Sequence, residues 1–148
     1  MRLWHIDLIP YLPKSQLIAQ WRELNSIFKK QDKHILINYV YDYPKEYLYC
    51  YTQAVIQEMC ERKIKIKSLD NYNNYFVGDV NFYWNVLYDE PNERFAEHNN
   101  EYLTICYYNL KEKYIRGQKD FTKDVWNNLD RFYMRKNFQI CIEARKKQ

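Results

Sequence analysis

The chain has 148 residues, the length of one domain, and a domain of this size buries roughly 70% of the surface that its unfolded chain exposes. Its 23 Lys and Arg residues against 19 Asp and Glu give a net charge of +4, which is compatible with a polyanionic partner and does not require one. No stretch approaches the ~18 apolar residues of a membrane span, and Asp7, Pro10 and Pro13 interrupt the early apolar run in which a secretory signal would lie. We therefore expect one domain over residues 1–148, located in the cytoplasm and not bound to a membrane.

The first clearly periodic segment runs from Lys14 to Lys30. Its apolar residues recur at the spacing of one helical face, which predicts an amphipathic helix. At about 100° per residue, the polar side of this helix carries both Arg22 and Glu23. The segment thus combines a core face with a polar face that holds an arginine and a carboxylate.

The next segments alternate between extended and helical patterns. Residues 34–43 are strand-like or extended, and Pro44 is well placed to begin a second helix that ends near residues 61–63. Residues 63–67, "KIKIK", alternate lysine with isoleucine, which is typical of a short strand or an extended solvated segment.

The second half of the chain begins with a segment, residues 68–91, that is rich in asparagine and aromatic residues. We expect a long structured loop there, with one short strand. A third helix is predicted over residues 98–116 and stops at Gly117. A fourth begins after Thr122 as its N-cap, and the basic tail of residues 137–148 is expected to be partly exposed.

Two residue types stand out in the composition. The 16 tyrosines favour an amphipathic aromatic surface on a helical protein, with a stacking surface for nucleotide bases as the alternative. The four cysteines, at positions 50, 60, 106 and 141, show no C-x-x-C spacing, so we expect buried reduced thiols.

Few kinds of catalytic site fit these residues. His5, His34 and His98 are far apart and form no metal-binding motif, and two glycines cannot form a glycine-rich phosphate loop, so neither a metal nor a cofactor is expected. The terminal amine remains as a nucleophile, because an α-amine has a reference pKa of about 7.7 to 8.0 against about 10.4 for lysine. A nearby carboxylate such as Glu23 could move the protons of imine formation, although from the residues alone an ordinary solvated glutamate is favoured.

Three stretches, taken in order, resemble the pyrimidine dimer DNA glycosylases. They are "SQLIAQWRELNSIF", then "HILINYVYDYPKEYLYCYTQAVIQEMCERKIKI", and later "HNNEYLTICYYNLKEKYIRG". The opening "MRLWHIDLIPYLP" is similar to the start of bacterial chains grouped with that family. The resemblance covers most of positions 1–116.

The resemblance implies a mainly α fold: a compact single-domain helical bundle with the N-terminal segment threaded between helices, so that the amine reaches the first helix. It also implies DNA repair. Family members excise the 5′ pyrimidine of ultraviolet-induced cyclobutane dimers through a Schiff base from the terminal amine, and then nick the strand by β-elimination as AP lyases. The implied partner is damaged double-stranded DNA.

The matching positions suggest a catalytic pair and a set of DNA contacts. Met1 supplies the nucleophilic amine, because the bulky Arg2 that follows it is a context in which methionine is retained, and Glu23 is the catalytic carboxylate. The implied DNA-binding residues are Arg2, Arg22, Lys30 and Lys113.

The chain also departs from the family pattern. Ser26 and Asn109 stand where the family has basic residues, which affects lesion affinity, and Trp126, Phe132 and Tyr133 are spaced like core residues of a helix. Two alternatives therefore stay open: a non-catalytic DNA-binding module of the same fold, and a helical domain whose tyrosines meet a protein partner. The preferred lesion and the oligomeric state are not specified.

Overall fold

The computed structural model describes residues 1–76 and 93–147, and this part of the chain is helical, without a strand. The expected mainly α class is confirmed. No helix within the described residues is long and apolar enough to cross a membrane. The elements in chain order are η1 (Ile6–Tyr11), α1 (Lys14–Lys30), η2 (Asn38–Asp42), α2 (Lys45–Glu61), α3 (Asp70–Phe76), α5 (Asn100–Ile115) and α6 (Lys123–Lys146).

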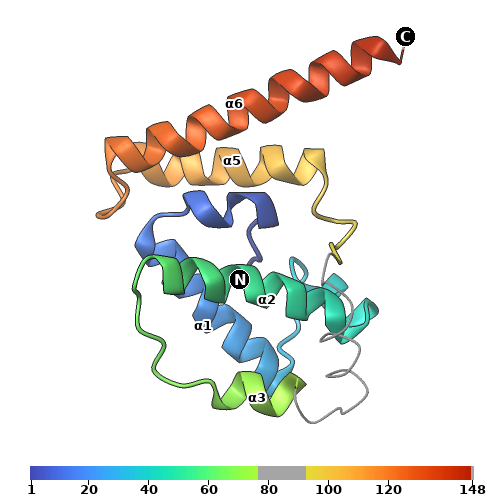
Figure 1. Cartoon of the computed structure of the whole chain (residues 1–148), viewed down its shortest axis with the longest axis vertical. Coiled ribbons are helices and arrows are strands. Elements are labelled where there is room, and N and C mark those ends of the chain that lie inside the picture. The colour runs from blue at the N-terminus through green and yellow to red at the C-terminus, as the bar shows by residue number, and fades with distance from the viewer. Residues whose placement is uncertain (77–92, 148) are drawn as a thin grey trace.

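The N-terminal segment lies between two layers of helices. In Figure 1, α5 and α6 form the upper layer, and α1, α2 and α3 form the lower one, with η1 in the space between. The 3-10 helix η1 packs against both α2 and α6. The expected threading of the N-terminal segment between helices is therefore confirmed.

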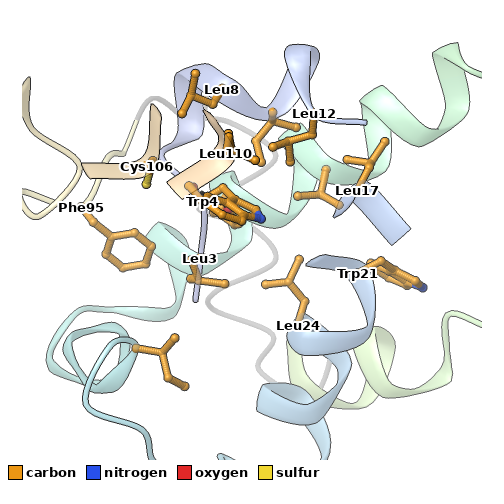
Figure 2. Close-up of a cluster of buried hydrophobic side chains, with 14 of the residues drawn as sticks. Leu3, Trp4, Leu8, Leu12, Leu17, Trp21, Leu24, Phe95, Cys106 and Leu110 are labelled. Carbon is orange, nitrogen blue, oxygen red and sulfur yellow. Dashed lines mark hydrogen bonds between the residues drawn. The ribbon is translucent and has the colours of Figure 1, made fainter. Parts of the chain in front are cut away.

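The first residues of the chain are part of the hydrophobic core. Leu3 is fully buried and Trp4 is 6% exposed. Figure 2 shows both side chains in the middle of the buried cluster, with Leu17 and Leu24 of α1 on one side and Leu110 of α5 on the other. The early apolar residues therefore anchor the amino terminus between the two layers.

The helices begin and end close to the residues that the sequence predicted. The helix α1 spans Lys14–Lys30 as predicted, and α2 begins directly after Pro44. The side chain of Thr122 caps α6 by accepting a hydrogen bond from the Val125 amide. The basic tail continues α6 as a helix to Lys146, and its last residues are exposed as expected.

The strand-like prediction for residues 34–43 was wrong. The carbonyl of His34 accepts hydrogen bonds from the amides of Ile37 and Asn38, which closes a turn, and η2 follows directly. The Asn38 side chain stabilises this turn by accepting a hydrogen bond from the His34 amide at 2.8 Å. Ile35 is 85% exposed, so the apolar residues here do not form a buried strand face.

The loop predicted for residues 68–91 contains a helix, α3, over Asp70–Phe76. Its aromatic residues explain the difference, because Tyr72 and Phe76 pack edge-on against Phe28 of α1. Asparagine lowers helix propensity, but packing against the core decides the local structure. Residues 68–76 hold no strand, and the rest of the segment in which a short strand was expected, residues 77–91, lies outside the described residues.

The cysteine prediction was half correct. All four thiols are free, and Cys50 and Cys106 are buried, but Cys60 and Cys141 are exposed. Cys60 lies in the last turn of α2 and Cys141 lies in the C-terminal part of α6, where few other elements cover the helix. An apolar sequence context therefore did not determine burial.

The aromatic residues of α6 join the core as predicted. Tyr133 is buried and stacks on Tyr107 with the ring centroids 3.8 Å apart, and Trp126 and Phe132 pack half-buried against the core. Many other tyrosines are half-buried with one side against the core, which is the arrangement expected for an amphipathic aromatic surface.

The end of α5 depends on a glycine. Gly117 adopts φ +81°, and the amides of Gly117 and Gln118 bond the carbonyls of Tyr114 and Lys113, the pattern of a Schellman motif. A Cβ at this position would meet no atom within 4 Å, so Gly117→Ala changes the backbone energy without a clash. We expect a loss of about 1 to 2 kcal/mol of unfolding free energy, measured by denaturant titration. Lys119→Ala, at an exposed loop position, serves as the control and should leave the unfolding free energy nearly unchanged.

Candidate active site at the amino terminus

Side chains from both layers hold the backbone of residues 2–6. The hydrogen bonds come from α1, from α2, from α5 and from the segment that precedes α5. No buried side-chain nitrogen or oxygen among the described residues lacks a hydrogen-bond partner. The anchoring side chains are Gln20, Glu23, Tyr51, His98 and Tyr102.

Gln20 makes the largest number of these contacts. Its Oε1 accepts hydrogen bonds from the Trp4 amide at 2.8 Å and from the Tyr51 hydroxyl at 2.9 Å. Its Nε2 donates to the Arg2 carbonyl and to Oε2 of Glu23, both at 3.2 Å. The side chain is almost fully buried, and it joins the N-terminal backbone to the carboxylate on the same helix.

Two tyrosine hydroxyls hold the backbone carbonyls of Leu3 and Trp4. The hydroxyl of Tyr51 lies 2.7 Å from the Trp4 carbonyl, and that of Tyr102 donates to the Leu3 carbonyl. Burial raises the pKa of both hydroxyls above the ordinary tyrosine value. Both therefore remain protonated donors at neutral pH.

His98 fixes the end of the anchored segment. Its Nδ1 accepts a hydrogen bond from the Ile6 amide at 3.1 Å, and its Nε2 lies 2.8 Å from the Tyr39 hydroxyl. Burial, together with the positive charges of His5 and Arg94, lowers the pKa of His98 to about 3. The imidazole is therefore neutral at physiological pH, as its role as an acceptor requires.

Glu23 lies beside the start of the chain. Its Oε2 accepts a hydrogen bond from the Arg2 amide at 3.4 Å, and the terminal nitrogen of Met1 lies one residue further, within about 4 Å of that amide. Burial raises the pKa of Glu23, while the Arg2 amide and the terminal ammonium oppose this change. The site thus brings a primary amine and a half-buried carboxylate together.

Met1 is exposed, although the residues that follow it are held in place. Met1 is 36% exposed, whereas Leu3 is fully buried. A terminal amine of this kind can act as a nucleophile toward an electrophilic carbon, and the adjacent carboxylate can transfer protons. The site therefore has the components of imine chemistry.

The two arginines predicted to bind DNA flank this pair differently. The guanidinium of Arg2 lies over the rings of Trp4 and Tyr102, 5.8 Å from each centroid, and the residue is half-buried. Arg22 is exposed on the neighbouring side of α1. Arg2 thus also contributes to packing, whereas Arg22 is fully available to a ligand.

The two predicted lysines lie apart from the amine and the carboxylate. Lys30 is in the last turn of α1, about 10 Å along the helix from Glu23 at 1.5 Å per residue. Lys113 is in the last turn of α5. Ser26 lies between Arg22 and Lys30 along α1, and the Asn109 side chain bonds the Ile105 carbonyl on its own helix.

Sequence reasoning missed Gln20, which organises the site. A signal was available, because Gln20 falls on the apolar face of α1 beside Leu17, Trp21 and Leu24, and a polar residue on a core face needs buried partners.

His5 and His98 are both buried, and the described residues contain no group of three or more His, Cys, Asp or Glu residues that could hold a metal ion.

Replacing Gln20 with leucine should loosen the amino terminus. The change leaves the Trp4 amide and the Arg2 carbonyl without partners, at a cost of about 1 to 3 kcal/mol for each buried group left unsatisfied. We expect faster hydrogen exchange at the Trp4 amide and a lower unfolding free energy. Gln57→Leu, at an exposed position of α2, is the matched control, and equal exchange rates in both variants would contradict the anchoring role.

The raised pKa of Glu23 predicts a stability effect with a defined sign. The folded protein binds this proton more tightly than the unfolded chain, so the ionised carboxylate lowers stability once the pH rises above the unfolded value of about 4.3. Glu23→Gln should therefore melt at a higher temperature than the parent protein at pH 7, with the difference closing below pH 4. Glu143→Gln, at an exposed site on α6, should show no such pH-dependent gain.

Comparison with known proteins gives one family match, which covers just under half of the chain. Residues 1–72 match the model of the family described as pyrimidine dimer DNA glycosylase. This region contains η1, α1 and α2, and thus Met1, Gln20 and Glu23. No curated protein and no solved structure gives a significant match. Over residues 1–72 the chain is therefore similar to the pyrimidine dimer DNA glycosylases, the family that its sequence resembles.

Proposed function

We propose that the protein is a DNA repair N-glycosylase with AP lyase activity that excises the 5′ pyrimidine of ultraviolet-induced cyclobutane dimers. The family match supports a DNA repair glycosylase in general terms. The observation that carries the finer proposal is the contact of the Arg2 amide with the Glu23 carboxylate, at 3.4 Å. This contact brings the terminal amine beside a carboxylate of raised pKa.

The first step of the proposed reaction replaces the base with the amine. The neutral amine of Met1 attacks C1′ of the deoxyribose, the nitrogen–carbon bond forms, and the glycosidic bond breaks as the base leaves with its electron pair. Glu23 accepts the proton that the amine loses and can return one to a leaving group. Opening of the sugar ring then gives an imine between C1′ and the terminal nitrogen.

The second step breaks the DNA strand. The imine acidifies the hydrogen on C2′, and its removal leads to cleavage of the bond between C3′ and the phosphate oxygen, so that the phosphate leaves in a β-elimination. Water then hydrolyses the imine and frees the amine. A carboxylate whose pKa is raised toward neutrality is a stronger base than an ordinary glutamate, which suits Glu23 to these proton transfers.

DNA binding in this proposal is mainly electrostatic. Arg2, Arg22, Lys30 and Lys113 contact phosphates, which position the duplex without reading its sequence. Chemistry at C1′ also requires distortion of the stacked bases, which costs a few kcal/mol and costs less at a lesion. The route requires no cofactor and no metal.

Borohydride trapping tests the mechanism directly. The protein, with its native amino terminus, is incubated with a duplex that carries one abasic site and, separately, one that carries a cyclobutane dimer. Borohydride should reduce the imine to a stable adduct, and mass spectrometry of the N-terminal peptide should place the adduct on Met1. Glu23→Gln should lower strand cleavage at least ~100-fold, the usual contribution of acid–base catalysis.

Two controls separate the alternatives. Glu143→Gln should cleave at the parent rate, and a chain with extra residues before Met1 should fold normally and form no adduct. DNA binding by the parent protein without any adduct would indicate the non-catalytic binding module instead. Absence of DNA binding would favour a protein-interaction domain.

A further inference from the structure

A groove of about 660 Å³ lies along α1, on the side that carries Arg22. One wall is the C-terminal half of α1, and the other is the extended segment that follows α2, residues 64–68. Its apolar lining includes Trp21 and Met59, and its polar lining includes the amides of Asn25 and Asn71, which bond one another at 3.2 Å. The groove is therefore a formed feature that connects α1 with α3.

The charge of this groove has one sign. Among the described residues, its lining holds five cationic side chains and no carboxylate: Arg22, Lys29, Lys30, Lys65 and Lys67. The whole chain carries a net charge of only +4, so the groove concentrates positive charge well above the average of the surface. Such a concentration of positive charge attracts polyanions.

The spacing of the cations suits a linear anion. Lys65 and Lys67 are exposed, while Ile64 and Ile66 between and beside them are half-buried, so the two lysines point to the same side of an extended segment about 7 Å apart. On the opposite wall, Arg22 and Lys29 are seven residues apart on α1, which is about 10 Å. Both walls therefore present cations at intervals along the groove.

The groove shares the helix α1 with the candidate active site. Arg22 lines the groove, and Glu23 is the next residue on the same helix. A DNA strand whose sugar reaches Glu23 can therefore continue past Arg22 between the two rows of lysines. Because this argument places a strand at Glu23, it rests on the function proposed above.

We propose that this groove binds the phosphate backbone of the DNA strand as it leaves the active site, with Lys65 and Lys67 as the phosphate contacts of its second wall. Lys29 and Lys30 also stabilise the C-terminal end of α1 through the helix dipole. Lys65 and Lys67 lie outside any helix, so their substitution tests the groove without altering a helix terminus.

The test compares Lys65→Gln/Lys67→Gln with a matched control, Lys119→Gln/Lys123→Gln, which removes the same charge from two exposed lysines outside the groove. The probe is a duplex with a tetrahydrofuran analogue of an abasic site, which binds without forming an imine. Its affinity is measured over a series of salt concentrations. Each lost phosphate contact should make the slope of log K against log salt less steep by about 0.9, or about 1.8 for the groove variant.

The control variant should keep the parent slope. An unchanged slope in the groove variant, or an equal change in both variants, would overturn the groove proposal. Borohydride trapping at saturating abasic DNA should be equal in the parent protein and the control variant, because the amine and Glu23 are intact in both. If the parent protein binds the probe but traps nothing, the proposed catalysis fails, while the slope comparison still decides whether DNA occupies the groove.

Discussion

The buried amide of Gln20 is the interaction on which the candidate site depends. It satisfies groups on Arg2, Trp4 and Tyr51 and reaches Oε2 of Glu23, so one side chain sets the distance between the N-terminal backbone and the carboxylate. An extended segment has no hydrogen bonds of its own, and its polar groups need partners when they are buried. Without such partners, a chain could not carry its first residues through the core.

Both helix layers of the fold supply side chains that hold the N-terminal segment in place. The lower layer supplies Gln20 and Glu23 from α1 and Tyr51 from α2, while the upper layer supplies Tyr102 from α5. The N-terminal segment therefore also connects the two layers, with Leu3 and Trp4 between them in Figure 2. Folding and assembly of the site are in this sense one event, because the contacts that hold the amine are also core contacts.

The position of Glu23 in this arrangement has a cost in folding free energy. Burial raises the pKa of Glu23, so the ionised carboxylate is held where the fold disfavours charge. Residues that act as bases are commonly held in such environments. Partial burial and the contact with the Arg2 amide therefore distinguish this glutamate from exposed glutamates such as Glu143.

Sequence patterns predicted the long helices well, since α1 and α5 depend on local periodicity and on end signals such as Gly117. They failed where tertiary contacts determine the secondary structure, as in α3, whose aromatic residues pack on Phe28. The pairing of Met1 with Glu23 came from a family resemblance, because no local rule connects residues so far apart. The groove cations Lys65 and Lys67 became visible only when distant segments were placed side by side, whereas the place of Gln20 on the apolar face of α1 was a signal in the sequence itself.

The contact between Arg2 and Glu23 also makes the proposed chemistry sensitive to how the nascent chain is processed. The nitrogen that the carboxylate touches at 3.4 Å is the amide of Arg2, which has no nucleophilic lone pair while it belongs to a peptide bond. In a chain from which Met1 had been removed, that same nitrogen would be a primary amine already in contact with the carboxylate. Removal of one residue would thus determine which nitrogen faces Glu23, so an aminopeptidase that acts on the new chain would shift the candidate site by one residue.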